Sequence, residues 1–181
     1  MTGYVTSAEV LIATSLDGFI AREDGDLGWL TGHPVPEGED YGYAAFMDGV
    51  GAIVMGRATY DTVRGFPDWP YAVPVVVISR TPEAVVVPVT LRDRVRVTAE
   101  SPAAVLAGLG VQGVGRAYID GGQLIRSCLA ADLIRRMVIS VIPVLLGAGR
   151  PLWGHGAGDI RLTLADVRHW PTGVAQLDYR G

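Results

Sequence analysis

Lysine is absent from the sequence: all fifteen basic residues among the 181 are arginine. Schiff-base catalysis on a lysine side chain is therefore excluded, because it needs a primary amine that can lose its proton. Any site that binds an anion must use guanidinium groups or backbone N–H groups instead.

Cysteine and long apolar runs are also scarce. Cys128 is the single cysteine, so no internal disulfide can form, which fits a reducing compartment. No apolar run reaches the roughly 18 residues of a membrane span. The opening residues, MTGYVTSAEV, lack the basic start and the apolar stretch of a signal peptide. We therefore expect a cytoplasmic protein without a membrane partner.

Clustered positive charge and metal-binding spacings are missing as well. The formal net charge is −4 and no basic run occurs, which argues against a nucleic-acid partner. The histidines His33, His155 and His169 show no ligand spacing, so no metal site is predicted. A G-x-S-x-G nucleophile motif is absent too.

What the chain does contain is enough apolar sequence for one domain spanning 1–181. Hydrophobic residues make up 49% of it, and the length suits one core rather than two. Short apolar segments rich in Val and Ile predict strands that are buried on both faces. These are 9–16, 51–56, 73–79, 95–99, 116–120 and a long strand that opens the segment 135–153 before a glycine turn.

Helical segments lie between these strands. Ser101 as N-cap and Pro102 at the first helical position mark one clear helix start. The tail predicts an antiparallel hairpin, and the stretch 21–39 is long enough for a functional loop. The alternation predicts an α/β fold with a mainly parallel sheet and an antiparallel edge. The expected helices are 40–48, 58–64, 101–109 and 123–133, and the hairpin strands are 161–170 and 173–180.

The ends of the predicted parallel strands combine glycine, hydroxyl groups and arginine. Ligands bind at these ends in open parallel sheets. Gly121 and Gly122 precede a helix start, where exposed N–H groups and the helix dipole favour an anion, although such a pair is also common in tight turns. Arg57 begins another helix and Arg80 ends a third strand. The pattern predicts one phosphate on the diglycine and a second between the two arginines.

Five motifs together resemble the dihydrofolate reductase-like family, and within it the branch that contains the reductase domain of riboflavin biosynthesis. Their order and spacing carry the resemblance over nearly the whole chain. They are SLDGFIA (15–21), GAIVMGRATYD (51–61), VVVISRTP (75–82), YIDGGQLIRSCL (118–129) and ISVIPVLLGAGRPLW (139–153). The resemblance implies a three-layer αβα fold with a mainly parallel twisted sheet, and an NADPH-dependent reductase of a pterin, a pyrimidine or a related heterocycle.

The resemblance also implies which residues hold NADPH. Gly56, Arg57, Ala58 and Thr59 would lie along the phosphates. Ser79 and Arg80 would face the adenosine 2′-phosphate, and Gly121, Gly122, Gln123 and Leu124 would carry the pyrophosphate. A side chain at either glycine of the pair would then occupy space that the cofactor needs.

On the substrate side the resemblance implies three further residues. Asp40 would orient or protonate the heterocycle, Trp29 would cover it, and Asp17 would lie where riboflavin-type members meet their substrate. Each has a structural alternative: Asp40 as a helix N-cap, Asp17 as a turn residue and Trp29 as a loop anchor. Cys128 lies on the apolar face of its helix and is expected to be packing.

Two departures from the family pattern concern the substrate. The loop between Trp29 and Asp40 is longer than in folate reductases, and Arg135-Arg136 replaces an acidic pair found after the last helix in riboflavin-type members. A non-catalytic protein that keeps the nucleotide cleft and binds a heterocycle is the alternative function. A homodimer is expected through the apolar strand 137–146, as in relatives.

Overall fold

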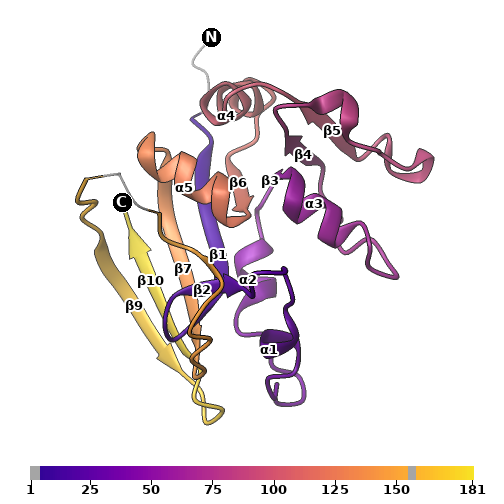
Figure 1. Cartoon of the computed structure of the whole chain (residues 1–181). Helices are drawn as coiled ribbons and strands as arrows, with labels where there is room; N and C mark the ends of the chain where they lie inside the picture. Colours follow the sequence, from indigo (N-terminus) through magenta and orange to yellow (C-terminus); the bar gives the residue numbers. More distant parts are fainter. Residues whose placement is uncertain (1–4, 155–157) are drawn as a thin grey trace.

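An eight-stranded twisted sheet organises the computed structural model, which describes residues 5–154 and 158–181 (Figure 1). The strand order is β5-β4-β3-β6-β1-β7-β10-β9, and the first six strands run parallel. The last two form the antiparallel edge hairpin. The strand bounds are β1 Ser7–Ser15, β3 Ala52–Gly56, β4 Val75–Ile78, β5 Val95–Thr98, β6 Arg116–Asp120, β7 Ile134–Ile142, β9 Thr163–His169 and β10 Ala175–Arg180.

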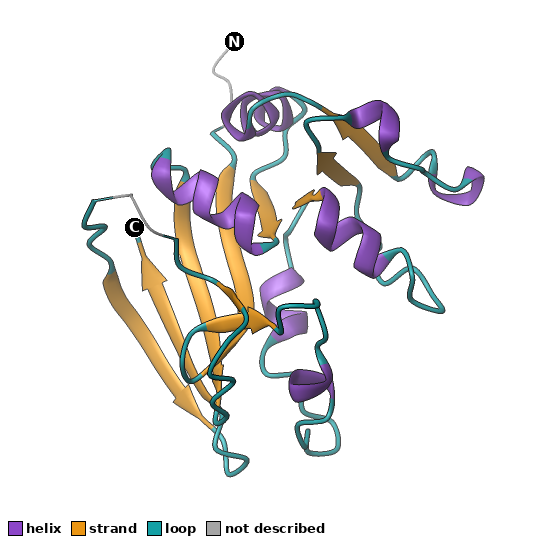
Figure 2. Cartoon of the chain, in the orientation of Figure 1, coloured by secondary structure: helices purple, strands orange, loops and turns teal. Residues whose placement is uncertain are grey.

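Helices cover both faces of this sheet and make three layers. One core cluster joins α4 and α5 to one face, and a second joins α2 and α3 to the other. Figure 2 shows α3 and α5 following directly on β3 and β6. The helix bounds are α1 Gly28–Thr31, α2 Tyr43–Met47, α3 Arg57–Val63, α4 Pro102–Val111 and α5 Gly122–Ala130, with 3₁₀ turns at Pro82–Ala84 and Val89–Leu91.

The predicted α/β fold, with its mainly parallel sheet and antiparallel hairpin, is confirmed. The strand β4, VVVI, shows why the pattern was informative: β-branched residues fit a pleated surface, and three of the four are buried between the two helical layers. The α4 start is also as expected, because Ser101 Oγ accepts a hydrogen bond from the Ala104 N–H at 3.2 Å. Among the described residues no helix is long and apolar enough to cross a membrane.

Three features differ from the sequence prediction. The stretch 21–39 contains the short helix α1, and the segment after β7 adds a strand, β8 Arg150–Pro151. This strand pairs with β2 Phe19–Ala21 in a separate two-stranded sheet. The long strand β7 ends at Ile142 because Pro143 follows and cannot donate to a ladder.

The apolarity of β7 is explained within one chain. Met137, Val138 and Ile139 are each at most 6% exposed and belong to the two cores. Their hydrophobic character is therefore not by itself a sign of a subunit interface, and the homodimer stays a prediction.

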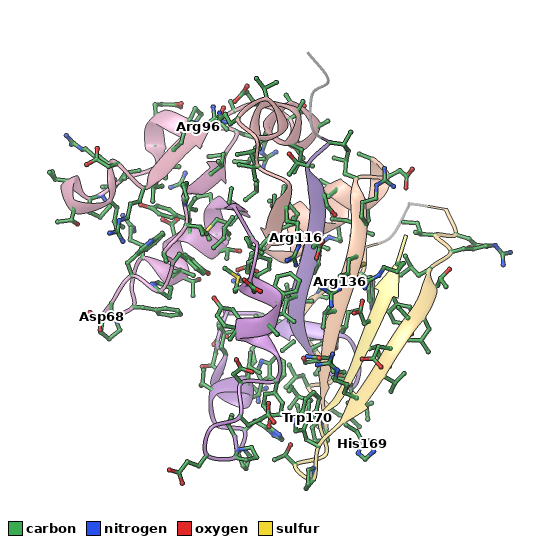
Figure 3. The ribbon with its side chains drawn as sticks, turned by 180° about the vertical axis from the view of Figure 1, so that it is seen from behind. Asp68, Arg96, Arg116, Arg136, His169 and Trp170 are labelled. Atoms are coloured by element: carbon green, nitrogen blue, oxygen red, sulfur yellow. The ribbon has the colours of Figure 1, made fainter. Side chains whose placement is uncertain are left out.

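An ion-pair network joins the middle strands on the face of the sheet that α2 covers. Glu9 on β1 accepts from Arg116 Nη2 at 2.9 Å and lies 3.5 Å from Arg136 Nη1. Arg136 also pairs with Asp178 at 2.8 Å. Figure 3 labels both arginines on the side of the sheet that faces away in Figure 1. Arg116 additionally donates to the carbonyls of Phe46 and Asp48, so the network fixes α2 against the sheet.

Acid should weaken this network, because Glu9 must stay ionised to hold it. Burial works against the charged form, but the hydrogen bond from Arg116 and the charges of Arg116 and Arg136 lower the pKa of Glu9 below its usual 4.5. A carboxyl with a depressed folded pKa stabilises the fold above the unfolded pKa and loses that contribution as the pH falls through the folded value.

We predict that Glu9→Gln lowers the free energy of unfolding at pH 7 by about 1.5–3 kcal/mol and flattens the loss of stability below pH 4.5. Urea denaturation across pH 3–7 measures both effects. The control Glu37→Gln changes an exposed carboxyl and should leave the curve unchanged. An unchanged acid limb in Glu9→Gln would contradict the prediction.

Candidate functional site

A large groove opens at the carboxyl ends of the parallel strands. Its volume is about 1330 Å³, and we call it the strand-end groove. It runs across the ends of β1, β3, β4 and β6 and between the starts of α3 and α5, with α1, β2 and β8 along its rim. A groove of this size accommodates a dinucleotide together with a second small molecule.

All ten residues predicted to hold the cofactor line this one groove. Three separate segments contribute them: the end of β3 with the start of α3, the end of β4, and the turn from β6 into α5. The residues are Gly56, Arg57, Ala58, Thr59, Ser79, Arg80, Gly121, Gly122, Gln123 and Leu124. The parallel pairing of β3 with β4 and β6 brings the three segments together.

Contacts within the protein favour glycine at both positions of the diglycine, most strongly at Gly121. Gly121 has φ of +98°, and a Cβ there would collide with Oγ1 of Thr59 on α3. A Cβ on Gly122 would stand 2.5 Å from Cδ1 of Ile20. Gly56, by contrast, has nothing within 4 Å of its Cβ direction. The two glycines thus let α3 and β2 approach the start of α5, whereas the space open to a ligand lies at Gly56.

Both helix starts at the groove lack a side-chain cap. Within the described residues, neither α3 nor α5 has a capping hydrogen bond or an acidic residue in its first turn. The N-terminal end of the nine-residue α5 carries the positive end of its dipole. The Arg126 guanidinium adds positive charge at this helix start. It lies beside Gly122, because a Cβ built on that glycine would be 3.3 Å from Arg126 Nη1.

Two of the groove arginines flank the end of β4. Arg57 is exposed; its Nε lies 3.3 Å from Asp61 Oδ2 and its Nη1 donates to Thr81 Oγ1 at 3.4 Å. Arg80 is exposed as well, and the neighbouring Ser79 Oγ accepts from the Thr81 N–H at 3.2 Å. This side of the groove therefore offers guanidinium and hydroxyl groups to an anion.

Two further arginines in the groove were missed from the sequence. Arg126 donates to the Pro151 carbonyl at 2.6 Å, and Arg150 donates to the Glu23 carbonyl at 3.2 Å. Arg126 lies four residues after Gly122, a spacing that returns a helical side chain toward the helix start and could have identified it. Arg150 comes from a distant segment that only the pairing of β8 with β2 brings here.

Asp17 serves a turn rather than the groove. It lies outside the groove lining and accepts hydrogen bonds from Ser15 Oγ at 2.6 Å and from the Gly147 N–H at 2.7 Å. These bonds, led by that from Ser15, lower the pKa of Asp17 to about 2. The carboxylate thus joins the turn after β1 to the turn after β7 and stays ionised at neutral pH.

Asp40 caps a helix, and its expected role at the substrate stays a prediction. It is exposed and lies outside the groove lining. Its carboxylate accepts from the N–H groups of Gly42 and Ala44, each at 2.8 Å, at the start of α2. The hydrogen bonds from Ala44 and Gly42 lower its pKa. A carboxylate held ionised in this way is poorly suited to donate a proton.

Trp29 also lies beside the groove lining rather than in it. Its neighbours Leu27 and Leu30 face the groove, whereas the indole Nε1 is buried with no partner among the described residues. The Nε2 of His33 is likewise buried without a hydrogen-bond partner among the described residues. Among the described residues no cluster of three metal-ligating side chains occurs, and His155 lies outside those residues.

Three acids line the groove, Glu23, Asp61 and Asp120, and of these Asp120 lies at the end of β6. Burial raises the pKa of Asp120 to about 6, and a hydrogen bond from the Gly121 N–H offsets part of this effect. Tyr71 and Tyr118 line the groove with it, and burial together with the Asp120 charge raises the pKa values of both. The Tyr118 hydroxyl donates to the Leu11 carbonyl at 3.0 Å, which fixes its ring.

Sequence reasoning passed over Asp120 although it directly precedes the diglycine. The available signal was an acid at the carboxyl end of a buried strand, where parallel sheets place their ligands. The raised pKa of Asp120 comes from burial, which depends on how distant parts of the chain pack around it.

The chain matches one protein family over most of its length. The family model named RibD C-terminal domain matches residues 8–176. The Bacillus subtilis protein YwjB, which is uncharacterised, is 34% identical over 93% of this chain and 94% of its own length. A second B. subtilis protein of uncharacterised function, YyaP, is 25% identical over 93% of this chain and 91% of its own length.

Solved structures share the same fold. A Shewanella sp. PV-4 protein, provisionally named a riboflavin biosynthesis protein, is 39% identical to this chain. The two structures align with a TM-score of 0.90 over 97% of this chain and 98% of that one. The Thermotoga maritima diaminohydroxyphosphoribosylaminopyrimidine deaminase/5-amino-6-(5-phosphoribosylamino)uracil reductase is 13% identical with a TM-score of 0.72. The alignment covers 97% of this chain but only 56% of that protein.

We predict that Gly121→Ala lowers the free energy of unfolding by about 1–3 kcal/mol, because it combines a left-handed φ with a collision at Thr59. Gly113→Ala is the matched control, since Gly113 has φ of +82° but nothing within 4 Å of its Cβ direction. Urea denaturation should show the larger loss for Gly121→Ala. Equal losses would mean that the approach of α3 to α5 does not require the glycine.

Proposed function

Because the chain belongs to the RibD C-terminal domain family, we propose that it is an NADPH-dependent reductase of a planar heterocycle such as a pterin or a pyrimidine. One observation carries the proposal: the strand-end groove unites an arginine-lined anion cradle with a carboxyl of raised pKa, Asp120, beside aromatic side chains. The chemistry that NADPH supplies when bound is hydride transfer.

The residues at the α3 and α5 starts fit the phosphates of such a cofactor. The open space at Gly56 allows a close approach to the backbone, and the start of α5 with Arg126 suits a pyrophosphate. Arg57, Arg80 and the hydroxyl of Ser79 suit the adenosine 2′-phosphate at the end of β4. NADPH therefore agrees with the distribution of charge along the groove.

The substrate would lie near the adjacent strands β1 and β6. Leu11 and Tyr118 are there, with Leu27 and Leu30 from the rim, and they provide an apolar slot for a flat ring. Asp120 is the acid in this slot. With a pKa of about 6 it is protonated often enough near neutral pH to give a proton to a ring nitrogen or oxygen. We assign Asp120 the proton-donor role that the family resemblance implies for Asp40.

We predict that Arg57→Ala weakens NADPH binding about tenfold, whereas NADH binding changes less than twofold, because only NADPH carries the 2′-phosphate. Quenching of protein fluorescence on titration with each nucleotide measures both affinities. Arg92→Ala, which removes an exposed arginine outside the groove lining, is the control. Equal weakening of both nucleotides would count against the phosphate assignment.

We predict that the reduction rate of wild-type protein falls above pH 6, approaching tenfold per pH unit, as Asp120 loses its proton. Asp120→Asn should abolish this dependence and slow the reaction about a hundredfold at pH 6. The assay follows NADPH oxidation with a panel of dihydropterins and aminopyrimidines.

Asp40→Asn separates the two candidate acids, because asparagine still caps a helix. It should leave the pH profile as in the wild type. Loss of the pH dependence in Asp40→Asn instead would return the acid role to Asp40. Tight binding of NADPH without turnover of any compound in the panel would favour a ligand-binding protein over a reductase.

A further inference from the structure

The guanidinium of Arg57 already has an anionic partner inside the groove. Asp61 follows it by one helical turn on α3, and its Oδ2 lies 3.3 Å from Arg57 Nε. Its other oxygen, Oδ1, lies 3.4 Å from Arg64 Nη2. Asp61 lines the strand-end groove together with Arg57, Arg80 and Thr81. A carboxylate therefore stands in the part of the groove that otherwise offers positive charge.

The geometry gives Asp61 two opposing effects on an incoming phosphate. While Asp61 holds Nε, the Nη1 of Arg57 donates to Thr81 Oγ1 at 3.4 Å in the loop after β4. This orients the guanidinium. Its negative charge, however, repels a phosphate that binds the same guanidinium, and the like-charge cost persists at short range even in a solvated groove.

The charge effect should outweigh the orienting effect. The side chains of Arg57 and Asp61 are 44% and 39% exposed, and exposed pairs of this kind contribute little to fixing a geometry. Thr81 also holds Arg57 from the other side. The repulsion, by contrast, acts on the two negative charges that distinguish a phosphate monoester from a hydroxyl.

We propose that Asp61 is a specificity-determining residue that limits the preference of this groove for a 2′-phosphorylated nucleotide over its unphosphorylated counterpart. The inference rests on the proposed NADPH site. It assigns to that site a residue, Asp61, that weakens the binding of the 2′-phosphate. Asp61 balances Arg57 so that the affinity for NADPH exceeds that for NADH by less than the arginines alone would produce.

Asp61→Asn tests this proposal, because asparagine keeps the size and the hydrogen-bond acceptor for Arg57 Nε but removes the charge. Titration with NADPH and with NADH, followed by protein fluorescence, gives the two dissociation constants. At low ionic strength NADPH should bind about threefold to tenfold more tightly, and NADH should change less than twofold. The gain should shrink in about 0.5 M salt, where the screening length falls to a few ångströms.

Asp68→Asn is the matched control. It makes the same change in net charge a few residues away, on an exposed side chain in the loop after α3 that does not line the groove (Figure 3). It should leave both dissociation constants unchanged. Thermal melts of the two variants check that each remains folded.

The outcomes separate this proposal from the proposed function. Unchanged or weaker NADPH binding in Asp61→Asn, or equal shifts for both nucleotides, would overturn the role of Asp61. A wild-type protein that binds neither nucleotide would overturn the cofactor site and this inference with it. Tighter NADPH binding in Asp61→Asn without turnover of any substrate would support the role of Asp61 while contradicting the reductase.

Discussion

The contact between the starts of α3 and α5 is the constraint on which the rest of the structure depends. Gly121 allows it, because any Cβ there would collide with Thr59. The parallel pairing of β3 with β6 sets both helix starts at one edge of the sheet, and the missing side chain lets them touch. The strand-end groove exists because these two helices begin side by side and leave on opposite faces of the sheet.

Burial separates the acids of this protein into structural and chemical groups. Asp17 and Asp40 are exposed and accept hydrogen bonds from backbone N–H groups, so they stay ionised and hold turns and helix starts. Glu9 stays ionised because Arg116 and Arg136 face it. Burial raises the pKa of Asp120 to about 6, because only hydrogen bonds from Gly121 and Tyr118 oppose it. The same functional group thus serves four purposes according to its neighbours.

The absence of lysine gives the groove its character. Arg57, Arg80, Arg126 and Arg150 supply the cations, and each guanidinium has more donors than one anion needs. Arg126 and Arg150 each also donate to a backbone carbonyl of the rim, and Arg57 also pairs with Asp61. These arginines therefore hold structural contacts and are also candidates for ligand binding. A lysine, with its single ammonium group, would be less able to make both kinds of contact.

The sequence by itself determined the α/β class, the terminal hairpin and the three segments that carry Arg57, Arg80 and the diglycine. Continuous Val- and Ile-rich runs and helix caps are local signals, so they can be read without knowing the fold. Only the tertiary structure decided that Asp40 is a cap, that Arg150 reaches the groove and that the pKa of Asp120 is raised. These outcomes depend on which distant side chains surround each group, and desolvation by distant neighbours leaves no trace in the local sequence.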